Sequence, residues 1–182
     1  MYHKEHIRLG SFSTSRTELR DLFKAWLVIS LAFAIAMSGF SISRIILVFF
    51  ISAFTVGIAF LFHELAHKIV AQHYGCEAEF RSFDKMLILA IVMSFFGFVF
   101  AAPGAVMISG PVGIRRNGTI SLAGPLTNLI LAFLCLLALF FMPIGILKNI
   151  FQYGFLINTW IALFNLLPFW NFDGRKIFAW NR

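Results

Sequence analysis

The chain has 182 residues, of which 60% are hydrophobic and only 13% are charged, with a mean hydropathy of +0.87. Soluble domains carry about 25% charged residues, so this composition excludes an ordinary soluble protein and indicates a polytopic membrane protein. We do not interpret the net charge of +7 as a nucleic-acid surface, because basic residues flank membrane spans on the cytoplasmic side. A lipid bilayer is therefore an expected partner, and nucleic acid is not.

Long uncharged runs fill most of the chain, without the repeated apolar and polar alternation of a β-barrel. Backbone polar groups in lipid must be satisfied internally, so we predict an all-α helix bundle. Residues 1–24 are predicted to form a cytoplasmic N-terminal segment and residues 25–174 the membrane core. Residues 175–182 are expected to begin a C-terminal segment that continues beyond this sequence.

The first helix is predicted from Ser15-Arg16-Thr17-Glu18, which fits a capping box. This helix should begin near Arg16 and enter the membrane at Ala25. A full crossing needs about 20 apolar residues. The simplest crossings are 25–42, 45–72, 122–142 and 149–168.

The second apolar span ends in the motif His63-Glu64-Leu65-Ala66-His67. Its spacing places two imidazoles one helical turn apart on one face, beside a carboxylate. Two such imidazoles can hold Zn²⁺, and the glutamate can take a proton from water. Ionisable side chains are expensive inside a membrane and mark functional sites there. The motif therefore predicts a metal site at membrane depth.

A catalytic zinc usually takes three protein ligands, so a third ligand is expected elsewhere in the chain. His73 lies on another side of the helix, and the thiol of Cys76 would depart from a site with two histidines and one carboxylate. The best candidate is Asp173, because Pro168 stops or kinks the last apolar helix and Gly174 allows a tight turn. An acid placed there would project from broken backbone into the bundle.

The uncharged run 86–114 is interpreted as re-entrant. If Asp173 shares a metal with the two histidines, the crossings between them must be even in number, and 122–142 with 149–168 already make two. Pro and Gly break the later part of the run. We predict a short strand at 105–109, paired with 118–121 through a turn at 115–117.

The distribution of basic residues agrees with this topology when the N-terminus lies inside. Of the 15 Lys and Arg residues, only Arg44 and Lys148 fall in the proposed outer loops. This bias is what the positive-inside rule requires. The protein is thus predicted to be a multi-pass protein of the cell membrane, with its N-terminus and metal site toward the cytoplasm.

Three segments in order give the chain a resemblance to a known family. They are the motif at 63–67, the Gly-Pro-x-x-Asn sequence within 121–128, and Asn-Leu-Leu-Pro at 165–168 followed by Asp173-Gly174. Together they resemble the signature motifs of the site-2 protease family of intramembrane zinc metalloproteases. In that family a second glycine often stands where this chain has Arg175.

The resemblance implies that His63, His67 and Asp173 bind one Zn²⁺ per chain and that Glu64 is the catalytic glutamate. It also implies that Asn128 helps to bind the substrate backbone or the developing oxyanion. The predicted function is a zinc-dependent intramembrane endopeptidase, an enzyme that hydrolyses peptide bonds within or near the transmembrane helices of membrane-protein substrates.

Two other functions stay open from the sequence. One is a non-proteolytic membrane protein that keeps the metal for structure or binding, although such a site needs no base at Glu64. The other is a metal-ion transporter, which should carry ionisable groups on several spans. The apolar stretches 25–37 and 130–141 carry none.

Overall fold

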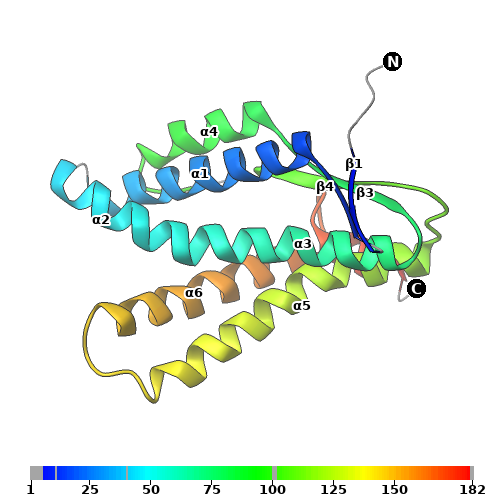
Figure 1. Ribbon diagram of the computed structural model, residues 1–182. Helices are drawn as coiled ribbons and strands as arrows, with labels where there is room; N and C mark the ends of the chain where they lie inside the picture. The colour runs from blue at the N-terminus through cyan, green and yellow to red at the C-terminus, as the bar shows by residue number, and fades with distance from the viewer. Residues whose placement is uncertain (1–5, 11, 40, 100–101, 181–182) are drawn as a thin grey trace.

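A computed structural model describes residues 6–10, 12–39, 41–99 and 102–180, so the two predicted end segments are described only in part. The chain is mostly helical (Figure 1). Its helices are α1 (Arg16–Ser38), α2 (Ile42–Ser52), the π-helix η1 (Ala53–Gly57), α3 (Ile58–His73), α4 (Asp84–Ser94), α5 (Ile114–Leu139), α6 (Ile146–Leu166) and α7 (Asp173–Trp180). Its strands are β1 (His6–Leu9), β2 (Phe12–Ser15), β3 (Glu77–Ser82) and β4 (Gly104–Ser109).

Helix α1 begins where the capping box predicts. The Ser15 hydroxyl accepts a hydrogen bond from the Glu18 backbone N–H at 3.1 Å, which satisfies one of the free donors at the helix start. The helix ends at Gly39, whose φ of 59° is left-handed and favours glycine. The predicted start is confirmed, and the helix ends a few residues before the predicted limit of 42.

The second apolar span is one helical rod of 32 residues, Ile42–His73, made of α2, η1 and α3. The π-turn of η1 lies where α1 crosses it, and the Trp26 indole donates a hydrogen bond to the Ala53 carbonyl at 3.1 Å. A Cβ on Gly57 would lie 2.3 Å from the Trp26 indole nitrogen, so glycine permits this close crossing. The crossing fixes the rod that carries the HExxH motif.

The structure corrects the predicted hairpin. Strand β4 forms as expected, but it pairs antiparallel with β3, from Glu77 opposite Ser109 to Ser82 opposite Gly104. The segment 118–121 is helical and belongs to α5, as do the residues predicted to form the turn. Strand β3 alternates charged residues with buried Ala78 and Phe80, which is the period of a half-buried strand.

The segment between β3 and β4 leaves the sheet and comes back to it. Ser82, the last residue of β3, lies opposite Gly104, the first residue of β4. The segment between them, which contains α4, therefore leaves and rejoins the sheet at the same end of the strand pair. The Phe83 N–H also donates to the Pro103 carbonyl at 2.9 Å. The re-entrant interpretation of the run 86–114 requires such a return of the chain, and it stays a prediction.

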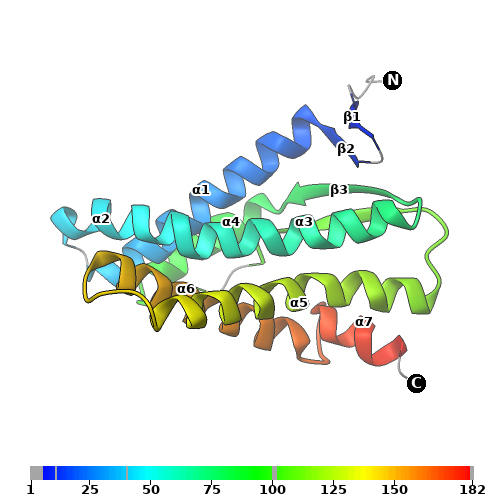
Figure 2. The same ribbon diagram turned by 60° about the horizontal axis from the view of Figure 1, so that its bottom comes forward.

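Helices α5, α6 and α7 form the other half of the molecule. They lie across α3 from α1 and α4 (Figure 1), and α7 runs alongside the N-terminal part of α5 (Figure 2). A Cβ on Gly118 would lie 2.5 Å from the Cβ of Trp180, so glycine lets α7 pack closely. Helix α6 ends at Leu166, shortly before Pro168, as the helix-breaking effect of proline predicts.

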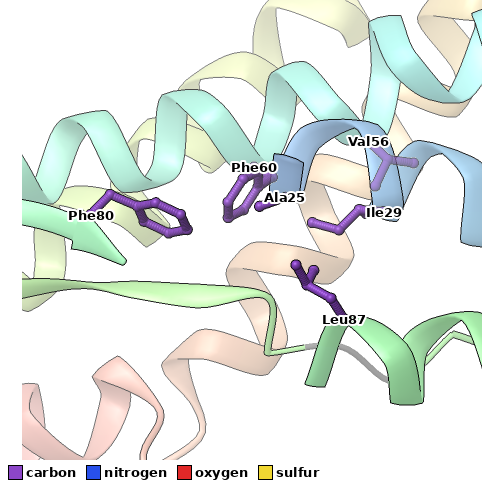
Figure 3. Close-up of a cluster of buried hydrophobic side chains, with 6 residues drawn as sticks. All are labelled: Ala25, Ile29, Val56, Phe60, Phe80 and Leu87. Carbon is purple, nitrogen blue, oxygen red and sulfur yellow. The ribbon is translucent and has the colours of Figure 1, made fainter. Parts of the chain in front are cut away.

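A cluster of buried side chains joins α1, η1, α3, β3 and α4 (Figure 3). The rings of Phe60 on α3 and Phe80 on β3 pack edge to face, with centroids 5.6 Å apart. The full cluster consists of Ala25, Ile29, Val56, Phe60, Phe80 and Leu87. This packing holds the small sheet against the rod that carries the histidines.

Three helices are long and apolar enough to cross a membrane: Arg16–Ser38, Ile42–His73 and Ile114–Leu139. At most 39% of the most apolar window of any of them is buried within the protein, so most of their apolar surface faces outward. These helices fit a membrane protein. The fourth predicted crossing is also a helix, α6, but it is not among these three candidate spans.

Candidate metal centre

Helix α3 presents both histidines of the motif on one face, as the spacing requires. The Nε2 atoms of His63 and His67 lie 3.0 Å apart, and both side chains are buried. The intervening Glu64 is buried as well. The two imidazoles therefore point at a common position next to a carboxylate.

Asp173 reaches the same position from the first residue of α7. Its Oδ2 atom lies 3.3 Å from His63 Nε2 and 3.1 Å from His67 Nε2. The neighbouring Gly174 allows this approach, because a Cβ there would lie 2.1 Å from the Leu166 carbonyl oxygen at the end of α6. Residues more than 100 positions apart in the sequence thus meet, as the predicted site requires.

The hydrogen on His67 is placed by the backbone of α5. His67 Nδ1 lies 2.7 Å from the Ile120 carbonyl oxygen. A carbonyl only accepts hydrogen bonds, so Nδ1 carries the hydrogen and Nε2 keeps its lone pair. That lone pair faces His63 and Asp173.

His63 is held by a side chain instead. Its Nδ1 lies 2.6 Å from Asn128 Oδ1. Asn128 on α5 is fully buried, and its amide group donates to the Ala59 carbonyl at 3.1 Å and to Asn158 Oδ1 at 2.8 Å. Asn128 thus lies behind His63, on the side away from the three converging atoms.

The three converging groups fit a zinc ion. Two imidazole lone pairs and a carboxylate oxygen within 3.0–3.3 Å of one another need a cation or protons between them. Two nitrogens and one carboxylate oxygen are a ligand set of catalytic zinc, with a fourth position left for water.

Helix α5 approaches the site through a glycine. A Cβ on Gly124 would lie 2.4 Å from His67 Nε2 and 2.7 Å from His63 Cε1. The following Pro125 lies within the helix and is buried. Glycine is therefore required at this position by space, since any side chain would enter the volume of the imidazoles.

Glu64 connects the metal ligands to the sheet. Its carboxylate interacts electrostatically with His63 and Asp173 and faces the backbone N–H of Val106 in β4. Lys176, one turn along α7, places its Nζ 3.6 Å from Asp173 Oδ1. The site thus has the Glu64 carboxyl group on one side and the Lys176 ammonium at its edge.

Among the described residues, the metal-capable group that converges here is His63, His67 and Asp173. The two alternatives weighed from the sequence, His73 and Cys76, are not part of it. Sequence reasoning missed the contacts of Gly124 and Lys176. The Gly124-Pro125 pair inside an apolar helix was the available signal for the contacts of Gly124, and no signal was available for Lys176.

Fold and site together define a helical protein with a metal centre of the zinc-hydrolase type. The chain is 44% identical over 176 residues to "Putative zinc metalloprotease MJ0611" of Methanocaldococcus jannaschii, a match covering 95% of this chain and 89% of the relative. "Zinc metalloprotease MJ0392" of the same organism is 27% identical over 172 residues, which is 94% of this chain and 44% of that protein. The chain therefore belongs to a family of zinc metalloproteases. No protein-family profile and no solved structure matches it.

Proposed function

We propose that this protein is an intramembrane zinc endopeptidase that cleaves membrane-protein substrates within or near their transmembrane helices. The observation that carries the proposal is the convergence of His63, His67 and Asp173 beside Glu64, on a helix apolar enough to cross a bilayer. The apolar surface of the three long helices supports a bilayer as the surrounding solvent. The scarcity of Lys and Arg in the proposed outer loops, which hold only Arg44 and Lys148, supports a cell-membrane location with the N-terminus and the site toward the cytoplasm.

His63, His67 and Asp173 would hold the zinc ion. When bound, zinc in such a site polarises a carbonyl and lowers the pKa of water. Glu64 acts as general base and takes the proton of the attacking water. The same carboxyl group then delivers the proton to the leaving amine. Asn128 has no substrate role in this proposal, because its oxygen faces His63.

The small sheet offers a place for an extended substrate. On β3, the Phe80 N–H donates to Glu18 Oε1 at 3.0 Å and the Ser82 N–H donates to Asp21 Oδ2 at 3.3 Å. Both groups therefore point away from β4 and toward α1. In an antiparallel ladder, residues opposite each other point their backbone groups the same way relative to the pair, either both inward or both outward.

It follows that Val106 and Gly104, which lie opposite Phe80 and Ser82, point their N–H and C=O groups away from β3. In the described part of the chain, β4 pairs with no second strand. The Val106 N–H faces Glu64, so this open edge adjoins the site. A substrate segment that adds to β4 as a further strand would bring its peptide bonds to the general base.

A transmembrane substrate must unwind before it can pair in this way. Its carbonyls are engaged in i→i−4 hydrogen bonds as long as it is helical. Residues with low helix propensity, such as Gly, Pro and Asn, unwind most readily. We therefore expect cleavage near such residues.

The test uses Glu64→Gln and Asp173→Ala in purified protein, with a transmembrane substrate in detergent. Glu64→Gln should retain zinc and lose about 100-fold or more of the cleavage rate, because it removes the general base. Asp173→Ala should lower the zinc content. Full cleavage by Glu64→Gln would refute the assigned base, and zinc flux into liposomes without any cleavage would support a transporter instead.

A further inference from the structure

A chain of hydrogen bonds runs from helix α6 through α5 to His63. Asn158 Nδ2 donates to the Gly154 carbonyl at 2.8 Å. Asn128 Nδ2 donates to Asn158 Oδ1, also at 2.8 Å, and Asn128 Oδ1 lies 2.6 Å from His63 Nδ1. Both asparagines are buried, so water does not compete for these bonds.

Two backbone carbonyls decide which group is the donor and which the acceptor in each of these hydrogen bonds. The Gly154 carbonyl only accepts, so Asn158 must turn its NH₂ group toward it and its oxygen toward Asn128. The Ala59 carbonyl, 3.1 Å from Asn128 Nδ2, also only accepts. Asn128 therefore turns its NH₂ group to both acceptors and its oxygen to His63.

The oxygen of Asn128 in turn requires a hydrogen on His63 Nδ1. The opposite tautomer would place a nitrogen lone pair against that oxygen at 2.6 Å, and a buried polar group without a partner is destabilising. With the hydrogen on Nδ1, Nε2 keeps its lone pair on the side of His67 and Asp173. Metal-binding histidines generally have their tautomer set in this way by the second nitrogen.

We propose that Asn128 and Asn158 are positioning residues that hold His63 in the tautomer and ring orientation needed for metal binding. This inference rests on the proposed zinc site and gives α6, which carries no ligand, a defined part in it. Helix α6 lies close enough because of Gly154, where a Cβ would come within 2.9 Å of Cys135 Sγ on α5. The two ligands differ here: His67 is held by backbone and His63 by replaceable side chains.

The test compares Asn128→Leu, Asn158→Leu and Asn128→Asp, all in the Glu64→Gln background so that no variant digests itself. Thr159→Val is the matched control, because Thr159 neighbours Asn158 on α6 and donates a similar bond to the Phe155 carbonyl at 2.7 Å. Two quantities are measured for each protein in detergent. One is the dissociation constant for Zn²⁺ by chelator competition, and the other is the protonation of each histidine nitrogen by ¹⁵N NMR.

Asn128→Leu should weaken zinc binding about 10- to 100-fold, as loss of such partners does in other zinc sites. Its NMR spectrum should show a mixture of His63 tautomers in the metal-free protein. Asn158→Leu should also weaken zinc binding and mix the His63 tautomers. Both effects should be smaller than in Asn128→Leu, because the Ala59 carbonyl still orients the Asn128 amide. Asn128→Asp keeps an acceptor for His63 and should bind zinc more tightly than Asn128→Leu, while Thr159→Val should match the parent.

The proposal would be overturned if Asn128→Leu or Asn158→Leu bound zinc as tightly as the parent protein and showed a single His63 tautomer. A loss of zinc affinity in Thr159→Val equal to that in Asn158→Leu would also overturn the proposal, because the effect would then come from a general loosening of α6. If Asn128→Leu fails to fold, Asn158→Leu still decides the question, by comparison with the parent protein and with Thr159→Val. A parent protein that binds no zinc would instead refute the proposed function, so the two failures are distinguishable.

Discussion

Gly124 is the residue at which an added side chain would overlap the histidine ligands directly. A single added methyl group would lie within 2.4 Å of His67 Nε2 and 2.7 Å of His63 Cε1. Interiors pack at crystal-like density and do not absorb such an overlap without a shift of backbone or side chains. The imidazoles or helix α5 must therefore move if this glycine is replaced.

We predict that Gly124→Ala loses most of its zinc and its cleavage activity while it still inserts and folds. The overlap is with the ligand atoms themselves, so metal content should fall at least as much as stability. Gly113→Ala is the control, because a Cβ there meets nothing within 4 Å. Zinc analysis of both purified proteins decides the matter, and parent zinc content in Gly124→Ala would show that the site adapts.

At the scale of elements, a buried ion pair ties α1 to the rod that carries the histidines. The Lys68 ammonium, one residue after His67, bonds the Glu18 carboxylate of α1. Both side chains are almost fully buried. The other Glu18 oxygen accepts the Phe80 N–H of β3, so one carboxylate joins α1, α3 and the sheet.

We predict that Lys68→Met lowers stability by about 3–5 kcal/mol, because it leaves the Glu18 carboxylate buried without its counter-charge. The double variant Glu18→Gln with Lys68→Met should recover part of the loss. Thermal or denaturant unfolding in detergent measures both. Lys24→Met breaks the exposed pair of Lys24 with Asp84, 2.5 Å apart, and should change stability by less than about 1 kcal/mol. Equal effects at the two pairs would contradict this account.

The order of the strands belongs to the same scale. Alternation in β3 and the Pro and Gly residues around β4 were readable as local patterns, yet the partner of β4 was predicted wrongly. The β-branched residues Thr119 and Ile120 favour a strand locally, but they lie in α5, where Gly118 packs closely against Trp180 of α7. Strand pairing depends on contacts between segments more than twenty residues apart, which local propensity does not encode.

For the whole molecule, the metal ligands come from two halves that are otherwise joined mainly through α5. Helix α3 supplies two ligands and α7 the third, so a bound ion would tie the α7 end of the chain to the central rod. A ligand that binds only the folded state stabilises it by about 4 kcal/mol at a thousand times its dissociation constant.

We therefore predict that a zinc chelator lowers the unfolding temperature of the Glu64→Gln protein. Asp173→Ala is the control and should show no response to chelator, because it lacks one ligand. Proteolysis of the loop between α6 and α7 should speed up on chelation in the first protein only. An unfolding temperature unaffected by chelator, in protein shown to contain zinc, would mean that the ion does not join the two halves.

The sequence by itself determined the local features of this protein. Composition indicates the apolar helices, Ser15 starts α1, Pro168 marks the end of α6, and one helical turn separates His63 from His67. The last three features follow from contacts within about four residues, because capping, proline geometry and helical spacing act over that range.

Tertiary structure decided what depends on the meeting of distant segments. Only the packed fold shows that β4 pairs with β3, that Gly124 makes room for the imidazoles, and that Asn158 reaches His63 through Asn128. These contacts join residues that lie tens of positions apart in the chain. Their geometry is set by the way whole helices pack, and no local pattern in the sequence records it.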